Sequence, residues 1–281
     1  MCHLQVGMIE VFIFIRLEKK MPTERFEFLG AERQKLAARL DIPEGEIRAY
    51  ALFAHCFTGG KDILAASRIG QALATCGIAV LRFDFTGLGA SEGEFSDTNF
   101  SSNLADLTAA ANYLRQTYRS PSMLIGHSLG GSAVLAVASK IPEVRGVVTI
   151  GAPSDPAHVK KQFSGYLDEI QTNGEAMVKL SGRSFRIKKQ FLIDAEKQRL
   201  LHTISKFDGA LLVMHSPQDE TVGVQNASHI FSVANHPKSF VSLDDADHLL
   251  TRKNDALYAA NVIAAWSERY IIGDTKKVER S

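Results

Sequence analysis

The ten residues from Ser122 to Gly131, SMLIGHSLGG, most constrain what this chain can fold into. An apolar, strand-like run leads into the pattern GxSxG, and a small, apolar, helix-compatible stretch follows it. Where a strand turns sharply into a helix, the serine at the turn takes a strained backbone angle that only small neighbours tolerate, here Gly126 and Gly130. The N–H groups that begin the helix can then stabilise negative charge. Ser128 is therefore a candidate nucleophile.

A second match to GxSxG, at residues 89–93, lacks this context. It follows the glycine-rich run TGLG and leads into EGEF, with no apolar strand directly before it and no amphipathic helix directly after it. We interpret it as a loop and its serine, Ser91, as no nucleophile. Ser128 itself has a structural alternative, since a short motif can also mark a simple turn.

From Glu24 onward, strand-like and helix-like stretches alternate, which predicts an α/β sheet. We expect strands at residues 24–29, 34–40, 49–55, 78–83, 122–126, 144–150, 210–214 and 240–243. We expect helices at residues 63–75, 103–118, 225–234 and 257–271, and one directly after Ser128.

Residues 154–208 interrupt this alternation between two core strands. They contain a helix-compatible stretch at residues 166–170, a hairpin at residues 176–187 that turns at Ser181 and Gly182, and a helical stretch at residues 191–201. An excursion of this length predicts a small inserted cap over the site. We therefore expect residues 21–281 to be one domain with a cap insertion at residues 154–208.

Residues 1–20 need a separate interpretation. The run VFIFI is very apolar but too short to span a bilayer, no Lys or Arg precedes it, and no small-residue cleavage site follows it. Met21 begins a segment typical of a natural start. Residues 1–20 are thus expected to be an N-terminal extension or the product of a misassigned start, and an extra edge strand is the alternative.

Composition excludes several classes of function. The 281 residues carry 32 basic and 31 acidic side chains, so no global field favours nucleic acid or an anionic membrane. The three cysteines are widely spaced and form no CxxC pair, which indicates neither a disulfide framework nor a metal site. We expect a cytoplasmic protein without cofactor, nucleic acid or membrane as partner, and a homo-oligomer remains open.

A serine hydroxyl needs a base, and the base needs an orienting acid. In this type of site the acid and the histidine follow the serine along the chain, in loops after later strands. The expected strand at residues 210–214 is followed by Asp219, and the strand at residues 240–243 by His248. We predict that Ser128, Asp219 and His248 form a catalytic triad.

Alternatives exist for each partner. Asp219 could instead cap the next helix, and Glu220 beside it is an alternative acid. His127 adjoins the nucleophile, but adjacent residues at such a turn point apart, so it is expected to pack or hydrogen-bond locally. The acidic run around His248 would raise the pKa of a nearby histidine, although a solvated turn is the more common explanation of such a run.

An oxyanion needs two preorganised donors, and the backbone N–H of Leu129 is the first. The second is expected in the loop after the strand at residues 49–55, and we favour the N–H of Phe57. Cys56 in the same loop is expected to be a small buried hydrophobe. The pair Gly59 and Gly60 lacks the frame of a phosphate-binding loop, which argues against nucleotide binding.

With these residues in place, the chain resembles the α/β-hydrolase superfamily, and more narrowly the hydrolase half of bifunctional α/β-hydrolase/OsmC proteins. The resemblance rests on the elbow at Ser128 and on the stretches AHCFT, KDILAAS, LRFDFTGLG and ADHLL. It implies an eight-stranded, mostly parallel sheet and a cofactor-free acyl-enzyme mechanism. The OsmC half is expected to be absent, because the chain ends soon after its last predicted helix. The oxyanion loop reads His-Cys-Phe where many relatives carry His-Gly, and the HGGG motif of one esterase group is missing.

These features favour a serine carboxylesterase that cleaves small to medium acyl esters through an acyl-enzyme on Ser128. An aminopeptidase-like or other amide hydrolase on the same triad is the first alternative. A non-catalytic binding module on a hydrolase scaffold is the second. Haloalkane dehalogenases and epoxide hydrolases use a carboxylate at the elbow, which argues against those reactions here.

Overall fold

The computed structural model describes residues 20–180 and 182–272. The expectations for the N-terminal extension fall on residues 1–20 and so, apart from Lys20, lie outside the described residues, as does Ser181 at the expected hairpin turn. No helix in the described ranges combines the length and the apolar composition needed to cross a membrane.

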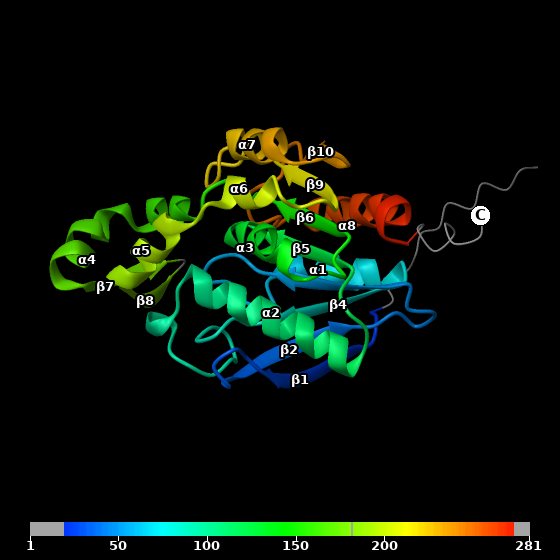
Figure 1. Cartoon of the computed structure of the whole chain (residues 1–281), viewed down its shortest axis with the longest axis horizontal. Helices are drawn as coiled ribbons and strands as arrows, with labels where there is room; N and C mark the ends of the chain where they lie inside the picture. The colour runs from blue at the N-terminus through cyan, green and yellow to red at the C-terminus, as the bar shows by residue number, and fades with distance from the viewer. Residues whose placement is uncertain (1–19, 181, 273–281) are drawn as a thin grey trace, which may run out of the picture.

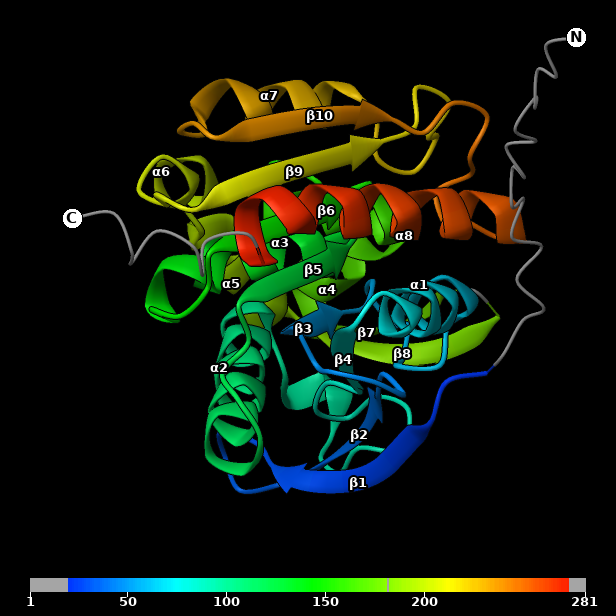
Figure 2. The same ribbon diagram turned by 90° about the vertical axis from the view of Figure 1, so that its right-hand side faces the viewer.

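Eight strands form the central sheet, in the spatial order β1-β2-β4-β3-β5-β6-β9-β10. Figure 2 shows them from β10 at the top to β1 at the bottom. β1 pairs with β2 and β2 with β4 antiparallel, and all other pairs are parallel. The predicted mostly parallel, eight-stranded sheet is confirmed. Its strands are β1 (Thr23–Leu29), β2 (Lys35–Asp41), β3 (Ala49–Ala54), β4 (Ile78–Phe83), β5 (Met123–His127), β6 (Gly146–Ile150), β9 (Ala210–His215) and β10 (Lys238–Ser242).

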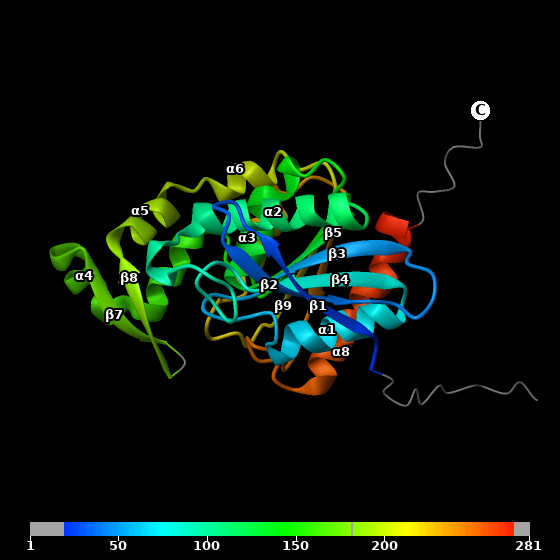
Figure 3. The same ribbon diagram turned by 90° about the horizontal axis from the view of Figure 1, so that it is seen from below.

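Helices cover both faces of the sheet. On one face α1 (Leu64–Thr75) and α8 (Lys253–Ser267) pack side by side, and α8 continues into a short π-helical turn at Glu268–Ile272. On the other face lie α2 (Phe100–Thr117), α3 (Leu129–Val137) and α7 (Gln225–Val233). Figure 3 shows α1 and α8 below the strands and α2 and α3 above them. Because both faces are covered, every residue of β3, β4, β5, β6 and β9 is buried, which explains their nearly continuous apolar sequences.

The expected start of α2 is wrong by three residues. The helix begins at Phe100, because the side chain of Asn99 accepts a hydrogen bond from the N–H of Ser102 while the Ser102 hydroxyl accepts from the N–H of Asn99. This reciprocal capping satisfies two donors that the first turn of a helix leaves without partners.

The insertion between β6 and β9 projects beyond one end of the sheet, on the left in Figure 1. Its hairpin pairs β7 (Glu175–Leu180) with β8 (Arg183–Lys188) in the register that the sequence predicts. Two details differ from expectation. A 3-10 segment, η3 (Pro156–Tyr166), precedes α4 (Leu167–Asn173), and the expected helix at residues 191–201 is broken into α5 (Lys189–Lys197) and α6 (Leu200–Ile204).

Polar contacts attach the insertion to the start of α2. Lys188 of β8 forms an ion pair with Asp97 of the short helix η1 (Phe95–Asp97). The amide of Gln190 accepts a hydrogen bond from Asn99 and donates one to the carbonyl of Thr98. The segment just before α2 thus holds one side of the insertion.

Candidate active site

Ser128 lies at the tight turn between β5 and α3, with φ 55° and ψ −126°. This is the strained, positive-φ conformation expected of the serine in a nucleophile elbow. Its N–H donates to the carbonyl of Ile150, 2.9 Å away on the neighbouring strand β6. A Cβ atom on Gly126 would overlap the backbone of Gly130, and one on Gly130 would overlap the carbonyls that end β3. The two glycines therefore leave the space in which the turn closes.

The structure brings the three residues of the predicted triad together. His248 Nε2 lies 2.9 Å from Ser128 Oγ, and His248 Nδ1 lies 2.7 Å from Asp219 Oδ2. Since a carboxylate only accepts, Nδ1 carries a proton, and Nε2 is then free to accept from the Ser128 hydroxyl. We call these three side chains the hydrogen-bond relay. It is an arrangement that can take a proton from the serine as its oxygen attacks a carbon.

Asp219 is held as a carboxylate. Burial alone would raise its pKa, but the hydrogen bonds from His248 and from the N–H of Val222, together with the electrostatic interaction with the rings of His248 and His215, hold the pKa below its usual value. Its second oxygen accepts from the N–H groups of Thr221 and Val222, at 2.9 and 2.8 Å. These bonds fix the turn after β9 and direct the other oxygen at His248.

Burial distinguishes Asp219 from Glu220, the alternative acid. Glu220 is exposed, whereas Asp219 is buried. Asp219 does bond backbone N–H groups, but in its own turn, and α7 begins only at Gln225. The side chain of Asp219 therefore spans from this turn to His248 and does not cap the helix.

Two further buried histidines surround the relay. His127 Nε2 donates to the backbone carbonyl of His248 at 2.6 Å, which is the local hydrogen bond expected for it. Burial, reinforced by the facing His248, lowers the pKa of His127 to about 4, so this ring is neutral at pH 7. His215 ends β9, and its Nε2 donates to the carbonyl of Val222 at 2.7 Å while lying 3.6 Å from Asp219. Burial lowers the pKa of His215 as well.

The role of His215 beside Asp219 was not anticipated from the sequence. The only signal was its place as the last residue of a buried strand, four positions before the acid. The acidic run before His248 is used locally and is exposed: Asp244 accepts from the hydroxyl of Ser242, and Asp247 from the N–H of Thr251.

The β3–α1 loop (residues 55–63) holds the predicted second oxyanion donor, Phe57. Its turn is closed by a 3.0 Å hydrogen bond from the N–H of Gly59 to the carbonyl of Cys56, and Thr58 within the turn has φ 56°. Leu129 is the first residue of α3, so its N–H has no acceptor within the helix. Burial raises the pKa of the Cys56 thiol to about 11, which keeps it protonated at neutral pH.

A buried ion pair anchors this loop. Asp84, directly after β4, accepts from the backbone N–H and from the Nζ of Lys61, each at 2.6 Å, and from the N–H of Ala90 at 2.9 Å. Burial alone would raise the pKa of Asp84, but these bonds lower it below its usual value. The Asp84 carboxylate thus ties the β3–α1 loop to the loop that follows β4.

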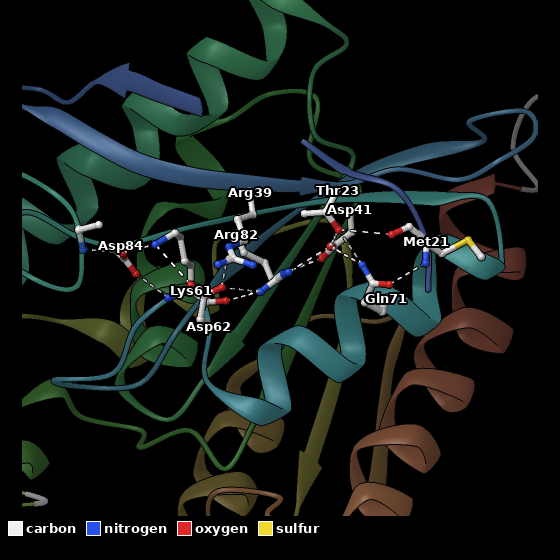
Figure 4. A network of polar contacts seen from close by, with 10 residues as sticks. Met21, Thr23, Arg39, Asp41, Lys61, Asp62, Gln71, Arg82 and Asp84 are labelled. Atoms are coloured by element: carbon white, nitrogen blue, oxygen red, sulfur yellow. Dashed lines mark hydrogen bonds and ion pairs between the residues drawn. The ribbon is translucent and has the colours of Figure 1, made fainter. Parts of the chain in front are cut away.

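Figure 4 shows that the same polar network continues to the first strand. Arg82 donates to the carbonyl of Lys61 and forms a two-point ion pair with Asp41, with distances of 2.7 and 3.1 Å. Asp41 also accepts from Thr23 and Gln71. Both charged groups of the Arg82–Asp41 pair are buried, so each depends on the other for compensation.

The second GxSxG match lies in the loop that follows β4, as interpreted from the sequence. The hydroxyl of Ser91 donates to the carbonyl of Asp84 at 2.6 Å and accepts from the N–H of Ala37 at 2.9 Å. Both bonds are structural, joining this loop to β2 and to the end of β4.

The tip of the insertion reaches the β3–α1 loop. The guanidinium of Arg183, at the start of β8, donates to the backbone carbonyl of Thr58 and lies 5.1 Å from the ring centre of Phe185. A small cavity opens beside Phe57 and Leu129 and is otherwise lined mainly by apolar side chains, among them Phe85, Leu88 and Phe95. No group of three or more His, Cys, Asp or Glu within the described ranges is arranged to hold a metal ion.

Comparison with known proteins assigns the chain to a family. Residues 45–186, half of the chain, match the family described as serine aminopeptidase, S33. Among solved structures, the esterase domain of a Rhodothermus marinus protein is 49% identical, covers 89% of this chain and 99% of its own, and superposes with a TM-score of 0.72.

Curated relatives are more distant. The mitochondrial palmitoyl-protein thioesterase ABHD10 of Mus musculus is 26% identical over 212 residues, which are 73% of this chain and 70% of that protein. Pyrrolizixenacetamide deacetylase of Xenorhabdus hominickii is 34% identical over 126 residues, covering 44% of this chain and 46% of its own length.

Proposed function

Because the chain belongs to the serine aminopeptidase S33 family and is a hydrolase of the α/β-hydrolase type, we propose that it is a serine carboxylesterase acting on small to medium acyl esters. The observation that carries this proposal is the hydrogen-bond relay, in which Ser128 Oγ, both ring nitrogens of His248 and Asp219 lie in continuous contact.

In the proposed mechanism Ser128 Oγ attacks the ester carbonyl carbon while its proton passes to His248 Nε2. Asp219 orients the ring and stabilises the imidazolium that forms. The backbone N–H groups of Phe57 and Leu129 donate to the oxyanion. His248 then returns the proton to the leaving alcohol, which departs and leaves an acyl-enzyme. A water molecule, deprotonated by His248, then attacks the acyl carbon, the bond to Ser128 Oγ breaks, and His248 returns the proton to Ser128 Oγ as the acid is released.

Two comparisons favour esters as the substrate class. The 49% identical relative is an esterase domain, and the ABHD10 protein is named a thioesterase, so both cleave an acyl group from an oxygen or a sulfur. The cavity beside Leu129 also supports an acyl group, because apolar side chains such as Phe85 and Leu88 form much of its wall. We further propose that residues 154–208 act as the cap of this site.

Amide hydrolysis on the same residues is the second candidate. The family description names an aminopeptidase, and one relative is an amide deacetylase. An aminopeptidase needs a carboxylate to hold the substrate amine, and none of the described residues lining the cavity beside Leu129 is Asp or Glu. The lining therefore favours the ester over a substrate with a free amine.

The test compares the wild-type protein with Ser128→Ala on p-nitrophenyl acetate and butyrate and on an aminoacyl p-nitroanilide. We expect ester hydrolysis by the wild type and its loss in the variant, together with labelling of Ser128 by a fluorophosphonate probe. Full esterase activity in Ser128→Ala would refute the nucleophile. Cleavage of the anilide alone would establish the amide hydrolase, and absence of both hydrolysis and labelling would leave a binding module.

A further inference from the structure

Five phenylalanine rings meet where the insertion covers the β3–α1 loop. The ring of Phe57 lies 5.4 Å from Phe191 of α5, 6.3 Å from Phe163 of η3 and 5.8 Å from Phe95 of η1, measured between ring centres. Phe95 in turn packs edge to face against Phe185 of β8, at 5.1 Å. The predicted oxyanion residue Phe57 is thus the centre of an aromatic cluster built mostly by the insertion and η1.

Two cavities are lined in part by Phe95 of this cluster. The inner cavity, beside Phe57 and Leu129, has a volume of about 10 Å³, which is room for about one water molecule. The outer cavity lies between the loop before α2 and the hairpin of the insertion, and its volume is about 400 Å³. Among the described residues that line the two cavities, Phe95 alone lines both.

Phe95 is held where it stands. Its carbonyl accepts from the N–H and the hydroxyl of Thr98, at 3.0 and 2.7 Å, which closes the turn of η1. Its ring is packed between Phe57 and Phe185. The ion pair between Asp97 and Lys188 fixes η1 against the same strand that carries Phe185. The Phe95 side chain is therefore fixed in position by its neighbours, and the residue borders both cavities.

We propose that Phe95 determines the acyl-chain preference of this site, by ending the inner cavity and so favouring acetyl-sized acyl groups over longer ones on Ser128. This proposal rests on the proposed esterase function. An acyl chain bound to Ser128, with its carbonyl oxygen between the N–H groups of Phe57 and Leu129, starts beside the inner cavity. A longer acyl chain would then meet the Phe95 ring. The outer cavity, which Phe95 also borders, has the space that each added methylene needs.

The proposal makes the selectivity depend on one ring. A site that excludes a methylene by crowding discriminates about tenfold or more against it. Removing the Phe95 ring should open the inner cavity towards the outer one, so the penalty on a longer acyl chain relative to an acetyl group should fall. Phe95→Leu, which keeps an apolar side chain of intermediate size, should give an intermediate penalty.

The experiment measures kcat/KM for p-nitrophenyl acetate, butyrate and hexanoate with the wild type, Phe95→Ala, Phe95→Leu and the control Phe240→Ala. Phe240 is a half-exposed phenylalanine on the edge strand β10, outside both cavities. We expect the wild type to prefer acetate to hexanoate by about tenfold or more, Phe95→Ala to raise the hexanoate value about tenfold, and Phe240→Ala to leave the profile unchanged. For the Phe95 variants the readout is the ratio of the hexanoate value to the acetate value, because Phe95 also packs against Phe57 and its replacement changes the surroundings of every substrate.

Thermal melts and fluorophosphonate labelling of Ser128 check that each variant is folded, and Phe95→Leu answers the question if Phe95→Ala does not fold. The proposal is overturned if the wild type cleaves hexanoate as readily as acetate, or if the Phe95 variants change all three substrates by the same factor. Either result leaves the esterase function intact. Absence of hydrolysis and labelling in the wild type would instead refute the proposed function, and with it the specificity assigned to Phe95.

Discussion

His127 and His248 are joined by a hydrogen bond of 2.6 Å from the ring Nε2 of the first to the backbone carbonyl of the second. A carbonyl only accepts, so His127 carries its proton on Nε2. Since His127 directly precedes Ser128, this bond connects the elbow to the main chain of the loop that holds His248. Ser128 and His248 are therefore connected twice, by the relay contact and by the buried ring of His127.

Replacing His127 tests this connection. In His127→Ala the carbonyl of His248 loses a buried donor, and the His248 ring is no longer held at a fixed distance from Ser128. We expect kcat for p-nitrophenyl acetate to fall about tenfold, comparable to the effect of one lost buried hydrogen bond, with little change in KM. The exposed His202 on α6 gives the matched control, His202→Ala, which should behave as wild type. A change in KM alone would argue against a positioning role.

The lowered pKa of His127 predicts how the free energy of unfolding depends on pH. In the folded protein burial lowers the pKa of His127 from 6.5 to about 4, so the unfolded chain binds this proton first as the pH falls. The contribution of the neutral His127 ring to the free energy of unfolding is therefore fully present above about pH 6.5 and is lost as the pH falls from about 6.5 to about 4. Urea unfolding at pH 7 and pH 5 should show that His127→Gln removes about 2 kcal/mol of the wild-type loss. Equal losses in both proteins would contradict the neutral state of this ring.

Asp219→Asn is predicted to be far more damaging than its neighbour Glu220→Gln. An amide at position 219 can no longer balance the imidazolium charge and favours the wrong ring tautomer, so kcat should fall on the order of 10⁴-fold. Glu220 is exposed and has no part in the relay, so Glu220→Gln should retain wild-type rates. Kinetics on p-nitrophenyl acetate compare the two. The reverse order of effects would make Glu220 the acid.

The Asp84–Lys61 ion pair is predicted to set the position of the β3–α1 loop. In Asp84→Asn the buried ammonium of Lys61 loses its compensating charge, and the loop that carries Phe57 loses an anchor. We expect kcat to fall about tenfold, in proportion to one or two weakened charge-assisted bonds. Lys61→Met combined with Asp84→Asn should lose less than the sum of the single variants.

A matched control for this pair lies on the surface. Arg115 and Glu143 form an ion pair of 2.6 Å whose side chains are about one-third exposed. Glu143→Gln removes one charge of that pair, as Asp84→Asn does of the buried one, and should leave kcat unchanged and stability nearly so. Additive effects of the two buried substitutions would show that Asp84 and Lys61 act independently.

Much of the core could be predicted because its determinants are local. The elbow is specified by two glycines, a strand and a helix that all lie between Met123 and Val137, and β4 matches its expected bounds at both ends. The loop that carries Asp219 follows the fully buried, apolar strand β9. The strand before His248, β10, has the weaker sequence KSFVS and begins two residues before its expected start. For these parts, periodicity and chain order carry the information.

The parts that could not be predicted depend on contacts between distant residues. The role of Asp84 depends on Lys61, which the β3–α1 loop brings to it from 23 residues away along the chain. From the sequence His215 is only the last residue of a strand; the turn that follows it places Asp219 beside its ring. The break between α5 and α6 likewise contains no proline or glycine from which it could be predicted.

The two glycines of the elbow have a consequence for how such sites are found. The atoms that forbid a Cβ at Gly126 and Gly130 are all main-chain atoms, from the elbow itself and from the end of β3. The glycines of the motif are therefore required by the closeness of the neighbouring main chain, and neither of them takes part in the proposed reaction. A search by backbone shape alone, with every side chain removed, would still recover this turn in chains whose sequences no longer resemble it.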